Sequence, residues 1–152
     1  MANSDKNIVY TQNDFLVVMS LSDKCGLTVE EIQAKDVPDG VTSYIVDHSS
    51  LPTDTDFQNA WVYKDGSVQV DLTKAKEVHK EYIRRERTEK LAALDIEFQR
   101  ALETSADTSA IVAKKQALRD ATADSAINAA TSTDQLKAQW NTSILGKSPY
   151  TS

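Results

Sequence analysis

The sequence predicts an α+β protein: a small N-terminal mixed α/β head with short antiparallel strands, then a long helix and a C-terminal αα-hairpin with a short third helix. Three observations predict this class. Residues 72–103 contain strong helix formers and neither Gly nor Pro. The apolar spacing changes from two to about 3.6 residues near Asp71. Short runs of β-branched and aromatic residues, separated by turn residues, fill the first part of the chain. We therefore expect a small α+β domain at residues 1–70, a helical arm and hairpin at 71–140, and an irregular tail at 141–152.

The predicted head contains four or five short strands and one helix. Residues 7–10 and 15–20 are apolar runs joined by the turn-prone sequence TQND, which predicts a hairpin. Thr28 and Glu31 have the spacing of a capping box, so a helix should begin there and extend through Ala34. Asp65-Gly66 predicts a second tight turn. The remaining strand candidates are residues 43–46, 60–63 and 68–70.

The long helix should begin at Asp71, a good N-cap residue, and its apolar residues should share one side. Residues 84–90 interrupt this stripe because none of them is apolar. We expect the helix to leave the head near Ile83, to cross solvent, and to enter a second packing zone near Leu91. An isolated helix of 32 residues would be roughly 48 Å long, so it should fold back on a second helix or bind a partner.

The sequence TSADTS at residues 104–109 should end this helix, because Ser, Thr and Asp side chains compete for backbone groups. A second helix at about residues 108–121 then predicts an antiparallel hairpin, with small alanines allowing close approach. Across it we expect ion pairs among Asp95, Arg100, Lys115 and Arg119. A capping-box pattern from Ser132 to Gln135 predicts the third helix, ending at Trp140, which should plug the open end of the hairpin.

The chain also resembles a group of bacteriophage proteins in several motifs. Residues 35–40 read KDVPDG, residues 57–61 FQNAW, residues 115–120 KQALRD and residues 133–140 TDQLKAQW. In combination these motifs resemble small proteins encoded beside tail-fibre genes in tailed phages, over residues 35–140. Such proteins are described as tail-fibre assembly proteins or tail-associated chaperones. The resemblance implies a non-enzymatic protein that binds a tail-fibre or other tail protein in the host cytoplasm during phage assembly. The alternative is a structural tail, baseplate or fibre-attachment component retained in the virion.

Composition and motifs argue against other classes of function. Residues 1–70 carry 4 basic and 11 acidic side chains, which disfavours nucleic-acid binding. No apolar run reaches the roughly 20 residues of a membrane span. No glycine-rich phosphate loop is present, and we expect no cofactor, no metal and no enzymatic activity. We interpret His48 as a polar-loop residue and His79 as a helix-surface or packing residue. We interpret Cys25 as a structural or incidental thiol. A catalytic or metal role for these three, and a weak cation site at Asp47, Asp54 and Asp56, are the less favoured alternatives.

Large apolar residues are the candidate protein-binding residues. On a continuous strand Phe57, Trp61 and Tyr63 would share one face, as the anchor of the head's core or as an exposed patch. The helical arm would present its stripe to a partner or to copies of itself, so a homo-oligomer is an open alternative. The predicted protein-binding residues are Phe57, Trp61, Tyr63, Leu91, Leu94, Phe98, Leu118 and Trp140.

Overall fold

The computed structural model describes residues 2–150 and confirms the mixed α+β class. The chain divides into two compact units, the first ending at Lys74 and the second beginning at Ala75. The division falls within the first turn of helix α2 (Leu72–Glu103), which has the predicted bounds. Lys74 donates its backbone N–H to Asp71 Oδ1 at 3.0 Å, so Asp71 caps this helix as expected.

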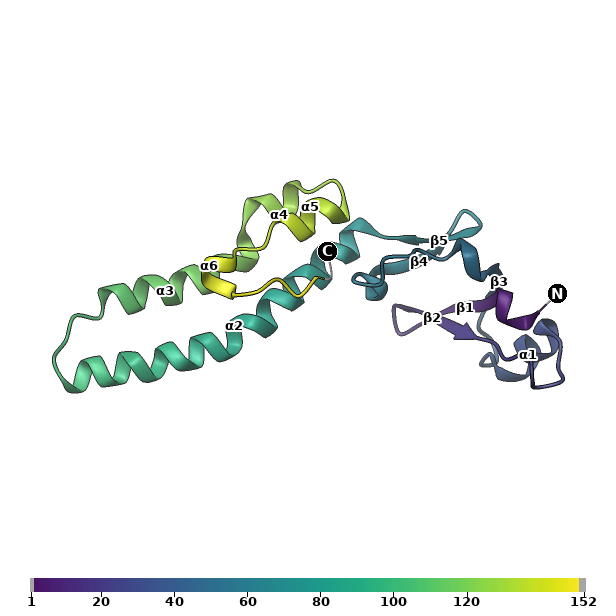
Figure 1. Ribbon diagram of the computed structural model, residues 1–152, viewed down its shortest axis with the longest axis horizontal. Helices are drawn as coiled ribbons and strands as arrows, with labels where there is room; N and C mark the ends of the chain where they lie inside the picture. Colours follow the sequence, from purple (N-terminus) through teal and green to yellow (C-terminus); the bar gives the residue numbers. More distant parts are fainter. Residues whose placement is uncertain (1, 151–152) are drawn as a thin grey trace. The chain divides into compact units, whose positions relative to one another are not determined.

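The first unit contains two antiparallel sheets (Figure 1). In the larger sheet, β1 (Lys6–Gln12) lies between β2 (Phe15–Ser20) and β3 (Ser43–Asp47). The smaller sheet pairs β4 (Trp61–Lys64) with β5 (Ser67–Val70). The predicted strands are therefore all present.

Both hairpins turn on two residues with positive φ. Asn13 and Asp14 join β1 to β2 at φ 53° and 67°, and Asp65 and Gly66 join β4 to β5 at φ 52° and 84°. Positive φ at both central positions is typical of the type I′ turn, whose twist matches that of the strands. The predicted Asp-Gly turn is confirmed.

Strand β1 is buried on both faces because successive side chains point to opposite sides of a sheet. Val9 packs with Val46, Trp61 and Val68, so the two sheets share one core. Ile8, on the other face, is fully buried, and α1 (Val29–Asp36) packs against β1. The capping box that starts α1 is confirmed: Thr28 Oγ1 accepts from the N–H of Glu31 at 3.2 Å, and the carboxylate of Glu31 accepts from the N–H of Thr28 at 2.7 Å.

In the second unit, α3 (Ser109–Asp120) runs antiparallel beside α2, as predicted (Figure 1). Lys115 Nζ lies 2.5 Å from Asp95 Oδ1, which confirms one expected cross-hairpin ion pair. Arg87 donates to the carbonyl oxygens of Leu118 at 3.4 Å and Arg119 at 3.0 Å. A cation at the carbonyl end of a helix satisfies its last acceptors and opposes its dipole.

The helix leaves the first unit earlier than expected, because the second unit begins at Ala75 and not near Ile83. Ile83 is fully buried in the second unit, as are Ala75 and His79 before it. Arg87, although charged, bridges α2 to the end of α3. A guanidinium can pack through its stem and still bond several carbonyls, so this charged stretch contacts α3 although none of residues 84–90 is buried.

The C-terminal part is more regular than the sequence indicated. Ser132 caps α5 (Thr133–Ala138) as predicted. The tail expected to be irregular instead contains α6 (Thr142–Leu145), capped by Asn141, whose Oδ1 accepts from the N–H of Ser143 at 3.1 Å. Burial of Leu145 holds this turn in place. An unpredicted helix, α4 (Ser125–Ala129), and a 3-10 turn, η4 (Ala121–Ala123), lie between α3 and α5. The described part of the first unit contains three more 3-10 turns: η1 (Asn3–Asp5), η2 (His48–Ser50) and η3 (Gln58–Ala60).

Candidate protein-binding surfaces

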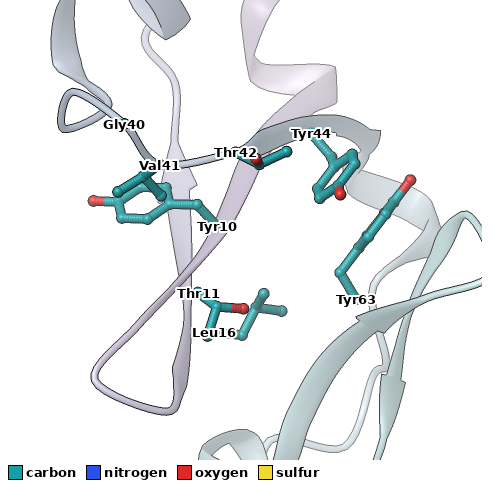
Figure 2. A pocket seen from close by; sticks show the side chains of 8 residues that line it. All are labelled: Tyr10, Thr11, Leu16, Gly40, Val41, Thr42, Tyr44 and Tyr63. Carbon is teal, nitrogen blue, oxygen red and sulfur yellow. The ribbon is translucent and has the colours of Figure 1, made fainter.

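An uncharged hollow lies beside β3 in the first unit (Figure 2). Its wall is the ring pair of Tyr44 and Tyr63, whose centroids are 3.9 Å apart with 16° between the planes. The loop before β3 turns at Gly40, where φ is +79°, a value that favours glycine. The hollow measures about 390 Å³ and is lined by Tyr10, Thr11, Leu16, Gly40, Val41, Thr42, Tyr44 and Tyr63. We call it the tyrosine hollow.

A second hollow of about 400 Å³ opens on the same unit near the start of α1. Ile45, the residue after Tyr44, contributes to its lining together with Leu27 and Val29. Tyr44 and Ile45 are 40% and 36% exposed, although both are large and apolar. We call this second space the isoleucine hollow.

Two of the three predicted aromatic residues in the head are core residues. Phe57 and Trp61 are 1% and 3% exposed, which agrees with the core-anchor interpretation and leaves neither on the surface. Phe57 does not share a strand face with Trp61 and Tyr63, because η3 (Gln58–Ala60) intervenes and Ala60 N–H donates to the carbonyl of Phe57 at 2.8 Å. Tyr63 is half-buried and reaches the tyrosine hollow.

The predicted protein-binding residues of the helical hairpin are buried or half-buried. Leu94 and Leu118 are 8% and 3% exposed, so these two side chains do not face solvent. Leu91 and Phe98 are half-buried, and the ammonium of Lys115 lies 5.3 Å from the centroid of the Phe98 ring. Leu94 and Leu118 are therefore not presented to a partner as expected, whereas Leu91 and Phe98 remain partly exposed.

Other apolar residues of the hairpin are exposed instead. Ile96 and Leu102 of α2 are 55% and 53% exposed, and Val112 of α3 is 49% exposed. Leu102 is next to the last residue of α2 and Val112 lies near the first turn of α3, so both are near the connection between the helices. The exposure of Ile96 and Leu102 departs from the expectation that the apolar residues of the long helix share one side. Two packed helices can cover only the sides that face each other, which leaves flanking apolar positions in solvent.

Trp140 belongs to a buried polar cluster built around His79. His79 is fully buried, and its Nε2 lies 2.8 Å from Gln139 Oε1 and 3.1 Å from the carbonyl of Gln139. The Nδ1 atom of His79 lies within hydrogen-bond distance of the hydroxyl of Tyr150. The Trp140 ring packs edge-on to His79 at 6.0 Å, and its Nε1 donates to the carbonyl of Gly146 at 2.9 Å. This cluster fastens the C-terminal segment to α2.

Three residues considered for catalysis or metal binding, Cys25, Asp47 and His48, make contacts within the first unit. Cys25 is exposed and donates to the carbonyl of Ser22 at 3.2 Å. His48 Nδ1 lies 2.8 Å from Asn7 Oδ1, and Asp47 pairs with Lys6. Within residues 2–150, no three side chains of His, Cys, Asp or Glu gather where they could hold a metal ion.

No helix in the described part of the chain combines the length and the apolar character needed to cross a membrane. Comparison of the sequence and structure with protein-family models, curated proteins and solved structures found no match.

Two exposed carboxylates are held in their ionised form. Bonds from the hydroxyl and then the backbone N–H of Ser4 lower the pKa of Asp23 below its ordinary value. Bonds from the hydroxyl and then the backbone N–H of Ser109 lower the pKa of Asp107 in the same way. Asp107 thereby fixes the start of α3 by accepting from its first residue.

Proposed function

We propose that this chain is a non-enzymatic bacteriophage tail-fibre assembly protein with a chaperone-like role. It binds a tail-fibre or other tail protein in the host cytoplasm during assembly. The family resemblance of residues 35–140 supports the phage context. The structure supports a protein-binding role through one observation: each unit has a core of its own, yet large apolar side chains among its described residues are exposed. These are Phe15, Tyr44 and Ile45 in the first unit and Ile96, Leu102 and Val112 in the second.

The size of these surfaces favours a temporary partner. Burying one large apolar side chain from full exposure is worth about 1.5–3 kcal/mol. Three side chains that are about half exposed therefore offer roughly 2–5 kcal/mol per unit. Association costs an estimated 4–15 kcal/mol, so neither unit alone supports tight binding. Engagement of both units, or a partner with its own exposed apolar surface, is needed.

The proposed mechanism is the covering of apolar surface. A fibre chain that has not yet trimerised exposes residues that its sister chains later bury, and such intermediates aggregate. A partner that binds this incomplete state and not the finished fibre keeps it soluble and is released when trimer contacts replace it. Ile96, Leu102 and Val112 are the exposed residues of the hairpin that would contribute to this exchange.

Co-expression with the fibre protein encoded beside this chain tests the proposal. We expect soluble trimeric fibre protein with the wild-type chain and aggregated fibre protein without it. A chain carrying Ile96→Ser, Leu102→Ser and Val112→Ser should lose at least half of this effect. The matched control changes two exposed polar residues of the same helices, Gln99→Ser and Gln116→Ser, and should behave as wild type. Fibre protein that is soluble and trimeric without the chain would contradict the proposal.

The alternative is a structural component that stays in the virion. The observation that favours it is α2, one uninterrupted helix of 32 residues that begins in the first unit and continues in the second. A continuous helix suits a connector between two binding partners. Mass spectrometry of purified particles separates the two roles, because a structural component is present in fixed copy number and an assembly factor is absent.

A further inference from the structure

Strand β3 is an edge strand with one side unpaired. It pairs with β1 only, at one end of the order β2-β1-β3. On its outer side the carbonyl of Ser43 accepts from Gln33 Nε2 at 3.3 Å. The carbonyl of Asp47 accepts from Ser50 Oγ at 2.6 Å. These two side chains satisfy the ends of the edge and leave its middle, at Ile45, without a backbone bond to any loop residue described within 2–150.

The geometry of the sheet places the backbone of Ile45 on that outer side. In an antiparallel pair, hydrogen-bonded and non-hydrogen-bonded residue pairs alternate. The two-residue turn is closed by Gln12 and Phe15, which must be a hydrogen-bonded pair, so even-numbered residues of β1 bond to β2. The odd-numbered residues of β1 bond to β3, where Val9 is opposite Tyr44. Ile45 therefore directs its N–H and C=O away from β1, as Ser43 does.

The two hollows are lined by adjacent residues of this edge. Tyr44 lines the tyrosine hollow and Ile45 lines the isoleucine hollow, because adjacent side chains of a strand point to opposite faces. A strand added beside β3 would alternate in the same way and send successive side chains into the two hollows in turn. Peptide recognition by strand addition uses this combination: backbone bonds supply affinity, and pockets for alternate side chains supply specificity.

Charge indicates the kind of segment that fits. The first 74 residues carry 5 basic and 12 acidic side chains. The tyrosine hollow is uncharged, whereas Lys6 and Glu30 contribute to the lining of the isoleucine hollow. Asp36 and Asp39 precede β3, and Asp47, which ends it, pairs with Lys6. An incoming strand should therefore be uncharged at its centre and basic at its ends. A second copy of this chain is disfavoured, because it would bring two acidic units edge to edge.

We propose that the outer edge of β3 binds an extended segment of a partner protein, with consecutive apolar residues at its centre and Lys or Arg at its ends. Backbone bonds form at Ile45, and the apolar side chains enter the tyrosine and isoleucine hollows. The inference goes beyond the proposed function and rests on it only in taking the partner to be a protein.

Binding of a synthetic probe peptide to the full chain tests this. The probe is acetylated and amidated KRTVIVTRK, and amide chemical shifts report where it binds. We expect shifts centred on residues 42–47. A probe with Pro in place of its central Ile lacks a backbone donor, and the probe EETVIVTEE has reversed charge at its ends; each should bind at least tenfold more weakly. Shifts centred elsewhere, or equal binding of the three probes, would overturn the proposal.

Variants of the chain separate the backbone bond from the side chain. Ile45→Pro removes only an outward N–H, because the bonds to β1 are made by the neighbouring residues, and proline is tolerated on edges. Ile45→Pro should weaken probe binding at least tenfold. Ile45→Thr keeps the N–H, so its affinity for the probe should stay within threefold of the wild-type affinity. If Ile45→Pro fails to fold, Thr42→Arg tests the same site by placing a positive charge at the tyrosine hollow. We expect a tenfold loss for Thr42→Arg and none for Thr42→Ser.

Two further results would overturn the assignment. Equal probe affinity in each variant and its control would exclude the edge. Concentration-dependent dimerisation without probe, with shifts at β3, would identify a second copy as the occupant. The outcome is distinguishable from the fibre test: a chain that binds the probe at β3 yet leaves fibre protein aggregated contradicts the proposed function alone.

Discussion

Truncation of Phe57 to alanine should destabilise the first unit selectively. Phe57 is 1% exposed and is among the largest fully buried side chains of the chain. Replacing a buried Phe by Ala removes its transfer free energy and leaves a cavity, at a combined cost of about 3–5 kcal/mol. A unit of 74 residues has a stability of about 4–11 kcal/mol at ordinary values per residue. The loss is therefore a large share of the total and should lower the melting temperature by roughly 12–40 °C.

The assay is urea unfolding followed by amide hydrogen exchange, which reports each unit separately. Phe15→Ala is the matched control, since it makes the same chemical change in the same unit at a side chain that is 53% exposed. It should cost less than about 1 kcal/mol. Exchange in the second unit should be unchanged in both variants. Equal stability losses at the two positions would refute the assignment of Phe57 to the core and would restore its interpretation as a surface docking residue.

Three more predictions follow from the helical unit and the two ionised carboxylates. Leu118→Ala should lower the free energy of unfolding by about 2–5 kcal/mol because the side chain is buried. Val112→Ala should lower it by less than about 1 kcal/mol. Urea unfolding measures both, and equal losses would contradict the burial of Leu118. Arg87→Met keeps the aliphatic stem but loses the hydrogen bonds to the carbonyls that end α3. Thermal melts should show that the free energy of unfolding falls by about 1–3 kcal/mol. An unchanged free energy would show that these bonds have no net effect on stability. Folding lowers the pKa values of Asp23 and Asp107. Their contribution to the stability of the fold is therefore present above the unfolded-state pKa of about 3.9 and is lost as the pH falls through the folded-state pKa. The destabilisation caused by Asp23→Asn should therefore be larger at pH 7 than at about pH 2–3, and a pH-independent effect would contradict this.

Local patterns predicted the fold where a few neighbouring residues decide the structure. The capping box at Thr28 and the Asp65-Gly66 turn act over two to four residues and are found as expected. The long helix is also defined locally, by its composition. The helices α4 and α6 were missed because five and four residues are too few to show a helical period.

The surface was harder to predict because burial depends on contacts distant in sequence. His79 contacts Gln139 and Tyr150, which are 60 and 71 residues away in the sequence. No pattern near His79 predicts that these residues pack against it. Phe57 was placed on a strand because the spacing to Trp61 fits a period of two, but a single 3-10 turn breaks that alternation. The exposed edge of β3 could not be recognised without the strand order.

The yield of trimeric fibre protein with and without this chain tests the central claim most directly. The claim is that the chain acts by covering apolar surface on an incomplete protein partner. It predicts that trimer yield rises with the amount of wild-type chain and falls when the exposed residues Ile96, Leu102 and Val112 are made polar. A trimer yield that is the same with the wild-type chain, with the polar variant and with no chain would contradict it.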